Sequence, residues 1–250
     1  MTMDTPRSFW QHVTELRTAI LWSVLVFAIA TVTAYVFVEP IFHILVKPLE
    51  VLFTAKGEAR RFIYTNLTEV FMTYLKVSLF TGLFITFPFI ALQAWRFISP
   101  GLYTRERKLF FILLFSVPVF FILGVLFAYL LVLPTAFSFF LSFETMIGTL
   151  PLQLETKISE YLSLVMRMLL AFGLSFELPV ILSGLAWLGM ITKETLIKRW
   201  RIAVVGVTFL AAIITPPDAL SMILLALPLL LLYALSIIIV SLIEKRKNHA

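Results

Sequence analysis

The longest uncharged stretch of this sequence, Leu109–Phe143, runs for 35 residues without an Asp, Glu, Lys or Arg. A second uncharged stretch, Thr18–Val38, has 21 residues. About 20 apolar residues in a helix span the hydrocarbon core of a bilayer, and a helix satisfies all backbone hydrogen bonds within one segment. A membrane barrel would show short segments of alternating polarity instead. The sequence therefore predicts an all-α integral membrane protein.

The composition supports this class of protein and excludes several kinds of chemical site. Hydrophobic residues make up 61% of the chain and charged residues 14%, whereas soluble domains average about 45–50% and about 25%. There is no cysteine, which excludes disulfides and thiolate metal sites. The three histidines, His12, His43 and His249, are widely separated. We expect no metal site and no cofactor.

We predict a single membrane domain over residues 1–250. Its six expected spans cover residues 18–38, 70–95, 109–134, 161–187, 201–215 and 219–243. Ser8 and Gln11 have the spacing of a capping box, and the apolar residues that follow fall on one helical face. This pattern predicts an amphipathic N-terminal helix on the membrane surface. The apolar part of the fifth span is only about 21 Å long, against a hydrocarbon core of about 30 Å.

Prolines and glycine mark the expected breaks between the spans. Pro48 lies in a polar connection between the first two spans, predicted to be a loop. Pro100 and Gly101 form an elbow in the central loop, because this pair continues neither helix nor strand. Pro216, Pro217 and Asp218 form the predicted turn before the last span.

The distribution of positive charge predicts the orientation in the membrane. Thirteen of the 20 Lys and Arg residues lie on the side of the two termini: Arg7, Arg17, Arg96, Arg105, Arg107, Lys108, Lys193, Lys198, Arg199, Arg201, Lys245, Arg246 and Lys247. Five lie on the opposite side: Lys47, Lys56, Arg60, Arg61 and Lys157. Lys76 and Arg167 are placed at the edges of spans. Positive residues collect on the cytoplasmic side, so both termini are expected there.

Motifs of several enzyme classes are absent from the sequence. It contains no glycine-rich loop followed by Lys-Ser or Lys-Thr, no Gly-x-Ser-x-Gly and no His-Glu-x-x-His. The chain is therefore not expected to be an enzyme or to hydrolyse nucleotides, and energy for transport would come from a partner or a gradient. Its basic residues flank membrane segments, so its pI near 9.7 does not indicate nucleic-acid binding.

Three acidic residues are candidates for function. Glu15 and Glu106 are both predicted on the cytoplasmic side, each beside an arginine; the structural alternatives are a surface pair with Arg17 and a counter-ion of the basic loop. Glu177 lies within a span, where an ionisable residue is a functional candidate by default. It either finds a partner in its own helix, such as Ser175, or receives a polar group from a partner helix.

Four motifs together resemble the TatC family, the multispanning subunit of the twin-arginine protein translocase. They are His12-Val-Thr-Glu15-Leu-Arg17, Phe97-Ile-Ser-Pro-Gly-Leu-Tyr-Thr-Arg-Glu106-Arg-Lys, Phe172-Gly-Leu-Ser-Phe-Glu177-Leu-Pro179 and Thr215-Pro-Pro-Asp218. The resemblance covers roughly residues 9–243, with the motifs in matching order and spacing. One departure is Thr18-Ala19, where family members often carry a second basic residue.

The resemblance implies that folded proteins are exported and that signal peptides with paired arginines bind at the cytoplasmic face. The implied signal-peptide site comprises Glu15, Arg17, Phe97, Tyr103, Arg105 and Glu106. Glu177 and Pro179 are the implied intramembrane contact with a partner, and Pro48, Pro100, Gly101, Pro216, Pro217 and Asp218 are the structural loop and turn residues. Implied partners are TatB-like and TatA-like single-span subunits in an oligomer, and membrane lipid, with drive from the proton-motive force. A carboxylate that accepts two hydrogen bonds from one guanidinium fits such recognition.

Two other classes of function remain open from the residues alone. A small-solute secondary transporter would also show broken helices and a buried acid, although the two halves show no evident internal repeat. A structural membrane scaffold would leave the Glu106 loop without a role. The expected location is the bacterial inner membrane, with a thylakoid or mitochondrial inner membrane as alternatives.

Overall fold

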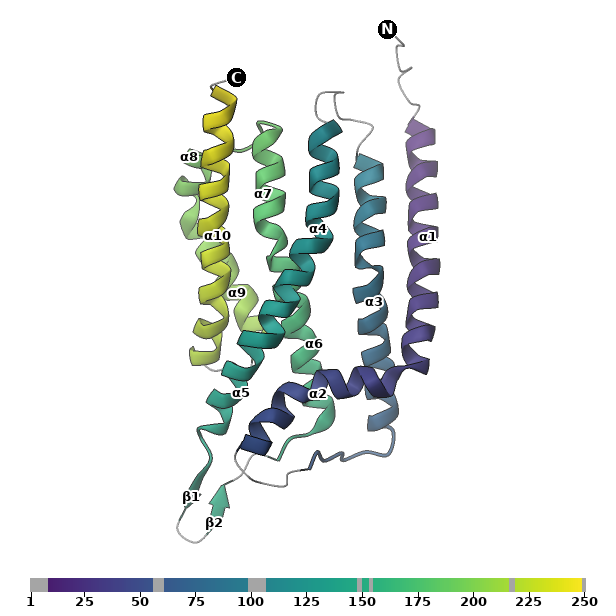
Figure 1. The fold of residues 1–250 in the computed structure, drawn as a ribbon, viewed down its shortest axis with the longest axis vertical. Coiled ribbons are helices and arrows are strands. Elements are labelled where there is room, and N and C mark those ends of the chain that lie inside the picture. Colours follow the sequence, from purple (N-terminus) through teal and green to yellow (C-terminus); the bar gives the residue numbers. More distant parts are fainter. Residues whose placement is uncertain are drawn as a thin grey trace. The chain divides into compact units, whose positions relative to one another are not determined.

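The computed structural model describes residues 9–55, 61–98, 107–147, 150–152, 155–215 and 219–248. Most of them are helical (Figure 1). The helices are α1 (Phe9–Val36), α2 (Val38–Ala55), α3 (Glu69–Ile98), α4 (Arg107–Phe127), a π-helical turn (Ala128–Val132), α5 (Leu133–Leu141), α6 (Ile158–Ser175), α7 (Glu177–Trp187), α8 (Lys193–Lys198), α9 (Trp200–Ile214) and α10 (Ala219–Asn248). Strands β1 (Thr145–Ile147) and β2 (Leu150–Leu152) form a small antiparallel hairpin.

The predicted class of an α-helical membrane protein is confirmed. Five helical stretches of the described chain are long and apolar enough to cross a bilayer: Val13–Val36, Glu69–Ala94, Phe115–Leu141, Ile158–Trp187 and Leu225–Lys245. Helix α9 is apolar but has only 15 residues, so it is about 22 Å long. A short apolar helix at the position of the predicted fifth span is confirmed, and its crossing of the bilayer stays a prediction.

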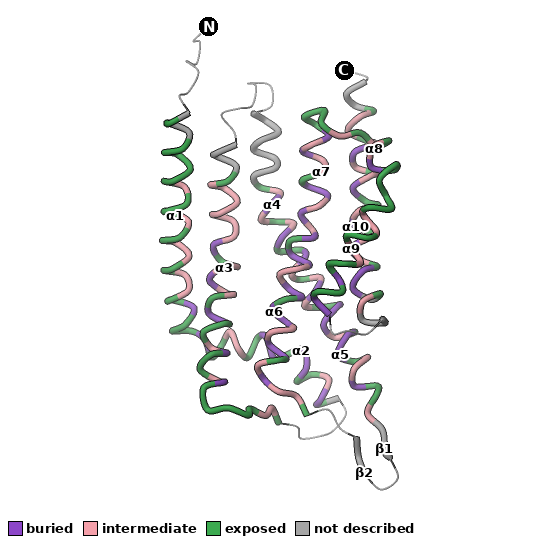
Figure 2. The backbone as a smooth tube through the Cα atoms, turned by 180° about the vertical axis from the view of Figure 1, so that it is seen from behind, coloured by how far each residue is buried: buried purple, intermediate pink, exposed green. Residues whose placement is uncertain are grey.

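The N-terminal lead-in is not a separate surface helix. Residues 9–17 are the first turns of α1, which continues without a break to Val36. Leu16, Arg17 and Thr18 contain no helix breaker, so nothing in the sequence ends the lead-in before the span begins. Trp10 is 75% exposed, and most of α1 is exposed along its length (Figure 2).

The connection after α1 is helical, and this corrects the prediction that Pro48 lies in a loop. Pro48 lies inside α2. A proline has no N–H, so it leaves the carbonyl of Ile44, one turn earlier, without its usual helical donor. The hydroxyl of Tyr129 donates to this carbonyl at 2.7 Å. Tyr161 donates to the next carbonyl, that of Leu45, at 3.0 Å. The proline is accommodated in a helix because a tyrosine replaces the missing donor.

This replacement gives a testable result. The change Tyr129→Phe should destabilise the protein by about 0.5–1.5 kcal/mol, the net value of a typical intramolecular hydrogen bond, because it removes the donor to the Ile44 carbonyl. The control Tyr64→Phe removes the hydroxyl of a tyrosine that is 65% exposed and should change stability little. Thermal unfolding in detergent measures both. Equal unfolding temperatures for the two variants would show that the Tyr129 hydroxyl does not support α2.

The described chain separates into two compact units, each of which is considered by itself. The first contains residues 1–41 and 74–118. In it, α1 and α3 approach closely at Gly82, where an added Cβ would lie 2.9 Å from the Cα of Thr31. The hydroxyl of Thr86 donates to the carbonyl of Gly82 within α3. A glycine at this point lets the two helix backbones meet.

The second unit contains residues 42–73 and 119–250. Its centre is built on α6, which packs against the π-helical turn, α7 and α9, while α10 packs along α7, α8 and α9 (Figure 1). The π-helical turn precedes Pro134, which again cannot donate to the helix; the N–H of Leu133 reaches five residues back, to the carbonyl of Ala128. Fully buried residues include Phe121, Leu162 and Phe172.

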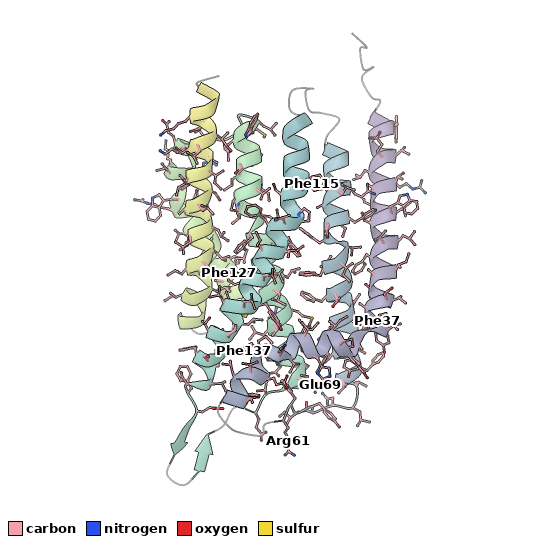
Figure 3. The ribbon with its side chains drawn as sticks, viewed as in Figure 1. Phe37, Arg61, Glu69, Phe115, Phe127 and Phe137 are labelled. Carbon is pink, nitrogen blue, oxygen red and sulfur yellow. The ribbon has the colours of Figure 1, made fainter. Side chains whose placement is uncertain are left out.

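Glu69 joins the start of α3 to the start of α6 in this unit (Figure 3). One carboxylate oxygen accepts from the Ser159 hydroxyl at 2.5 Å, and the other accepts from the Thr65 N–H at 2.8 Å and the Asn66 N–H at 3.4 Å. The Lys157 ammonium lies 4.0 Å away. Glu69 is thus the reciprocal acid of a helix-start motif.

Candidate functional site

Glu15 and Arg17 are exposed on the first turns of α1. They are two residues apart, so their side chains diverge by about 200° around the helix. Phe97 belongs to the last turn of α3. The other predicted signal-peptide residues, Tyr103, Arg105 and Glu106, lie outside the described residues, as do Pro100, Gly101, Pro216, Pro217 and Asp218.

Glu177 occupies a helix break inside the fourth span. Helix α6 ends at Ser175, Phe176 forms the junction, and α7 begins at Glu177. Two residues later, Pro179 lacks an N–H, so the carbonyl of Ser175 has no helical donor. The break in the span therefore follows directly from the position of Pro179.

The Glu177 side chain is 5% exposed, and neither carboxyl oxygen has a hydrogen-bond partner among the described residues. Ser175, which the sequence offered as a local donor, does not supply one. Unpaired buried polar groups are rare in proteins because each costs free energy. The Glu177 carboxyl group is therefore a candidate contact for a polar group from outside the described residues.

A glycine–aromatic contact holds this break in place. An added Cβ at Gly124 of α4 would lie 2.5 Å from the carbonyl oxygen of Phe172 and 2.9 Å from the Cβ of Phe176. The ring of Phe127 lies 5.8 Å from that of Phe172 and 5.5 Å from that of Phe176; Figure 3 labels Phe127 on α4. Gly173 receives the ring of Phe121 in the same way. Backbone contact at the glycines therefore fixes α6 immediately before Glu177.

The fourth span begins further from Glu177 than the predicted position of Arg167 implies. Arg167 was placed at the edge of the fourth span, but α6 begins nine residues earlier, at Ile158. Glu177 lies about 28 Å along the span from Ile158 and about 15 Å from Trp187. It therefore still lies within the span, in the half nearer Trp187. Arg167 is exposed on α6, where its Nε donates to the carbonyl of Ser163 at 3.1 Å.

The sequence analysis did not identify three polar side chains that form long-range hydrogen bonds in this structure. The Tyr129 and Tyr161 hydroxyls pair with backbone of α2, 85 and 116 positions away. Glu69 pairs with Ser159 at a separation of 90. A buried tyrosine needs a partner, so the tyrosines carried a usable signal, although their partners could not be named.

Comparison with known proteins gives consistent matches over the chain. The family model for Sec-independent protein translocase protein (TatC) matches residues 11–228. TatC of Rickettsia prowazekii is 44% identical over 237 residues, which cover 95% of this chain and 94% of the relative. TatC of Haemophilus influenzae is 32% identical over 248 residues, which cover 99% of this chain and 94% of the relative. A crystal structure of the twin arginine translocase receptor TatC superposes with a TM-score of 0.80 at 36% identity and covers 93% of this chain and 99% of that chain.

Fold and matches together define a multi-pass helical protein of the inner membrane that takes part in protein translocation. Within this class, the chain belongs to the TatC family of the Sec-independent, twin-arginine translocase. Membership places it in a Tat complex with other subunits. The resemblance expected from the four sequence motifs is confirmed.

Proposed function

We propose that this protein is the receptor subunit that binds twin-arginine signal peptides at the cytoplasmic face of the membrane. The observation that carries the proposal is the exposed carboxylate of Glu15 on α1 in a chain of the TatC family. The solved relative is described as a twin arginine translocase receptor, which supports the same role here. Glu15 and Glu106 would each accept paired hydrogen bonds from one guanidinium of the signal peptide.

The remaining residues of the proposed site have distinct roles. Phe97 and Tyr103 would contact the apolar part of the signal peptide, and Arg17 and Arg105 belong to the same proposed site. Pro100 and Gly101 would set the direction of the loop. Pro216, Pro217 and Asp218 would hold the outer turn before α10.

The proposed assembly contains TatB-like and TatA-like single-span subunits, with Glu177 and Pro179 at the contact with one of them. The protein acts without enzymatic activity of its own, and the proton-motive force drives export of folded proteins. It works as one six-span domain surrounded by lipid. No nucleic acid takes part.

Binding of a twin-arginine peptide to purified protein tests the receptor role. The change Glu106→Gln keeps the shape of the side chain and removes its charge, so binding should weaken by about 1.5–3 kcal/mol, the value of a hydrogen bond to a charged group. Glu15→Gln should have a similar effect. Fluorescence anisotropy of a labelled signal peptide measures the affinity.

Glu39→Gln is the matched control, because it removes an exposed acid near the other end of the first span. Its affinity for the peptide should equal that of the unchanged protein. If Glu106→Gln binds as tightly as Glu39→Gln, Glu106 is only a counter-ion of the basic loop. Export of a folded reporter that depends on the two arginines of its signal separates this function from a solute transporter and from a scaffold.

A further inference from the structure

A short helix folds back at the end of the fourth span and is fixed there by its neighbours. Helix α7 ends at Trp187, and Gly189, two residues later, has a φ of 75°, in the left-handed region. The N–H of Gly189 donates to the carbonyl of Ala186, and that of Met190 donates to the carbonyl of Leu185. These two bonds form a Schellman motif, which reverses the chain. Thr192 then caps α8 by accepting from the Thr195 N–H at 3.3 Å.

Helix α8 is held against α10 by two hydrogen bonds and an apolar contact. The Lys193 N–H donates to a carboxylate oxygen of Glu244 at 2.9 Å, and the Tyr233 hydroxyl donates to the carbonyl of Leu196 at 2.8 Å. The Leu196 side chain packs with Ala186 and Val240. Figure 1 shows α8 beside the C-terminal part of α10. The helix is therefore a fixed part of the second unit.

This arrangement gathers positive charge at one end of α7–α10. We define the α8 patch as Lys193, Lys198, Arg199, Arg201 and Lys245. All of these except Lys193 are exposed, and no salt bridge between described residues involves any of the five. Two acids lie nearby, Glu194 and Glu244, and one oxygen of Glu244 is already used by the backbone of Lys193. The patch carries a net positive charge.

Exposed aromatic and apolar side chains surround the same patch. Trp187 is 47% exposed and Trp200 52% exposed. Met190 and Ile197 are also exposed, and the guanidinium of Arg201 lies 6.0 Å from the centre of the Trp200 ring. Tryptophans of membrane proteins collect at the level of the lipid headgroups. The cations of the patch therefore lie at the depth of lipid phosphates.

We propose that the α8 patch binds the phosphate groups of anionic phospholipids in the leaflet on the side of the termini. Exposed guanidinium and ammonium groups supply the charge complementary to a phosphate. The tryptophans and the apolar side chains beside them supply contact with the glycerol and upper acyl region. Because α8 is fixed to α7 and α10, these cations are already in place before a lipid arrives, which favours binding.

Native mass spectrometry of the full-length protein in detergent tests this site, with dioleoyl phosphatidylglycerol as the anionic probe and dioleoyl phosphatidylcholine as the neutral one. The unchanged protein should bind phosphatidylglycerol about tenfold or more tightly, because each basic residue near an anionic surface contributes roughly a fivefold gain. The double change Lys198→Gln and Arg201→Gln should remove most of this preference. Inorganic phosphate at the same concentration should not displace the lipid.

The double change Lys47→Gln and Arg61→Gln is the matched control, since it also removes one exposed lysine and one exposed arginine. It should keep the preference for phosphatidylglycerol. The charge-conserving pair Lys198→Arg and Arg201→Lys should keep it as well, which separates loss of charge from loss of folding. An unchanged preference after Lys198→Gln and Arg201→Gln would overturn the proposal. So would equal loss in the control, or displacement by inorganic phosphate.

Discussion

Replacing Glu177 by Leu should reduce export by about tenfold or more, whereas replacing it by Gln should preserve much of it. A hydrogen bond to a charged or buried group is worth about 1.5–3 kcal/mol, and 1.4 kcal/mol corresponds to a factor of ten. Gln matches the size of Glu and both donates and accepts, so it can still pair with a polar group of a partner helix. Leu fills the space and offers no hydrogen bond.

The Glu177→Leu protein should accumulate normally and bind the signal peptide normally. Both oxygens of Glu177 lack a hydrogen-bond partner among the described residues, so removing them breaks no bond within the described chain. The control Glu39→Leu makes the same chemical change at an exposed acid and should leave export intact. Export of a folded reporter, normalised to the amount of protein, measures the effect. Full export with Leu at position 177 would refute the proposed contact.

The second large effect is expected at Gly124. The change Gly124→Ala adds a methyl group 2.5 Å from the carbonyl oxygen of Phe172. Because that atom belongs to the backbone of α6, relief of the clash requires the two helices to separate. Overpacking of this kind costs about 1–3 kcal/mol, and it would also displace the helix break that presents Glu177. We expect a lower unfolding temperature together with reduced export.

Gly206 provides the internal control, since an added Cβ there meets no atom within 4 Å. The change Gly206→Ala should be neutral or slightly stabilising, because Ala is the better helix former by about 1 kcal/mol in water. Scanning fluorimetry in detergent compares the two variants under identical conditions. If Gly124→Ala unfolds at the same temperature as Gly206→Ala, the close approach of α4 and α6 is not a constraint on stability.

The spans could be predicted because the membrane imposes one dominant requirement, a run of apolar residues of sufficient length. The short α9 followed from the same rule, since charges before it and Thr215-Pro216-Pro217 after it leave only a brief apolar run. The break at Glu177 was also foreseeable, because Pro179 removes a donor at a known position. These features depend on residues close together in the sequence.

The remaining features depend on partners that are distant in the sequence. Helix α2 was missed because Pro48 indicates a loop unless the Tyr129 hydroxyl satisfies the carbonyl that it frees. The fixed position of α8 depends on Tyr233 and Glu244 of α10. Gly189 and Thr192 indicate where α7 ends and where α8 begins, but they do not indicate which helix α8 packs against. The proposed acids, Glu15 and Glu106, were predicted from motifs and still await the binding measurement.

The contacts of residues 42–73 also fix the order in which the protein can be completed during its synthesis. The hydroxyl that donates to Glu69 belongs to Ser159, which is synthesised 90 positions later. The hydroxyl that donates to the carbonyl of Ile44 belongs to Tyr129, which is synthesised 85 positions later. At about 5–20 residues per second, the ribosome needs roughly 5–20 s to supply these partners. Throughout that interval α2 and the start of α3 are already made but lack the groups that hold them. The second unit can therefore close only after the beginning of the fourth span has been translated.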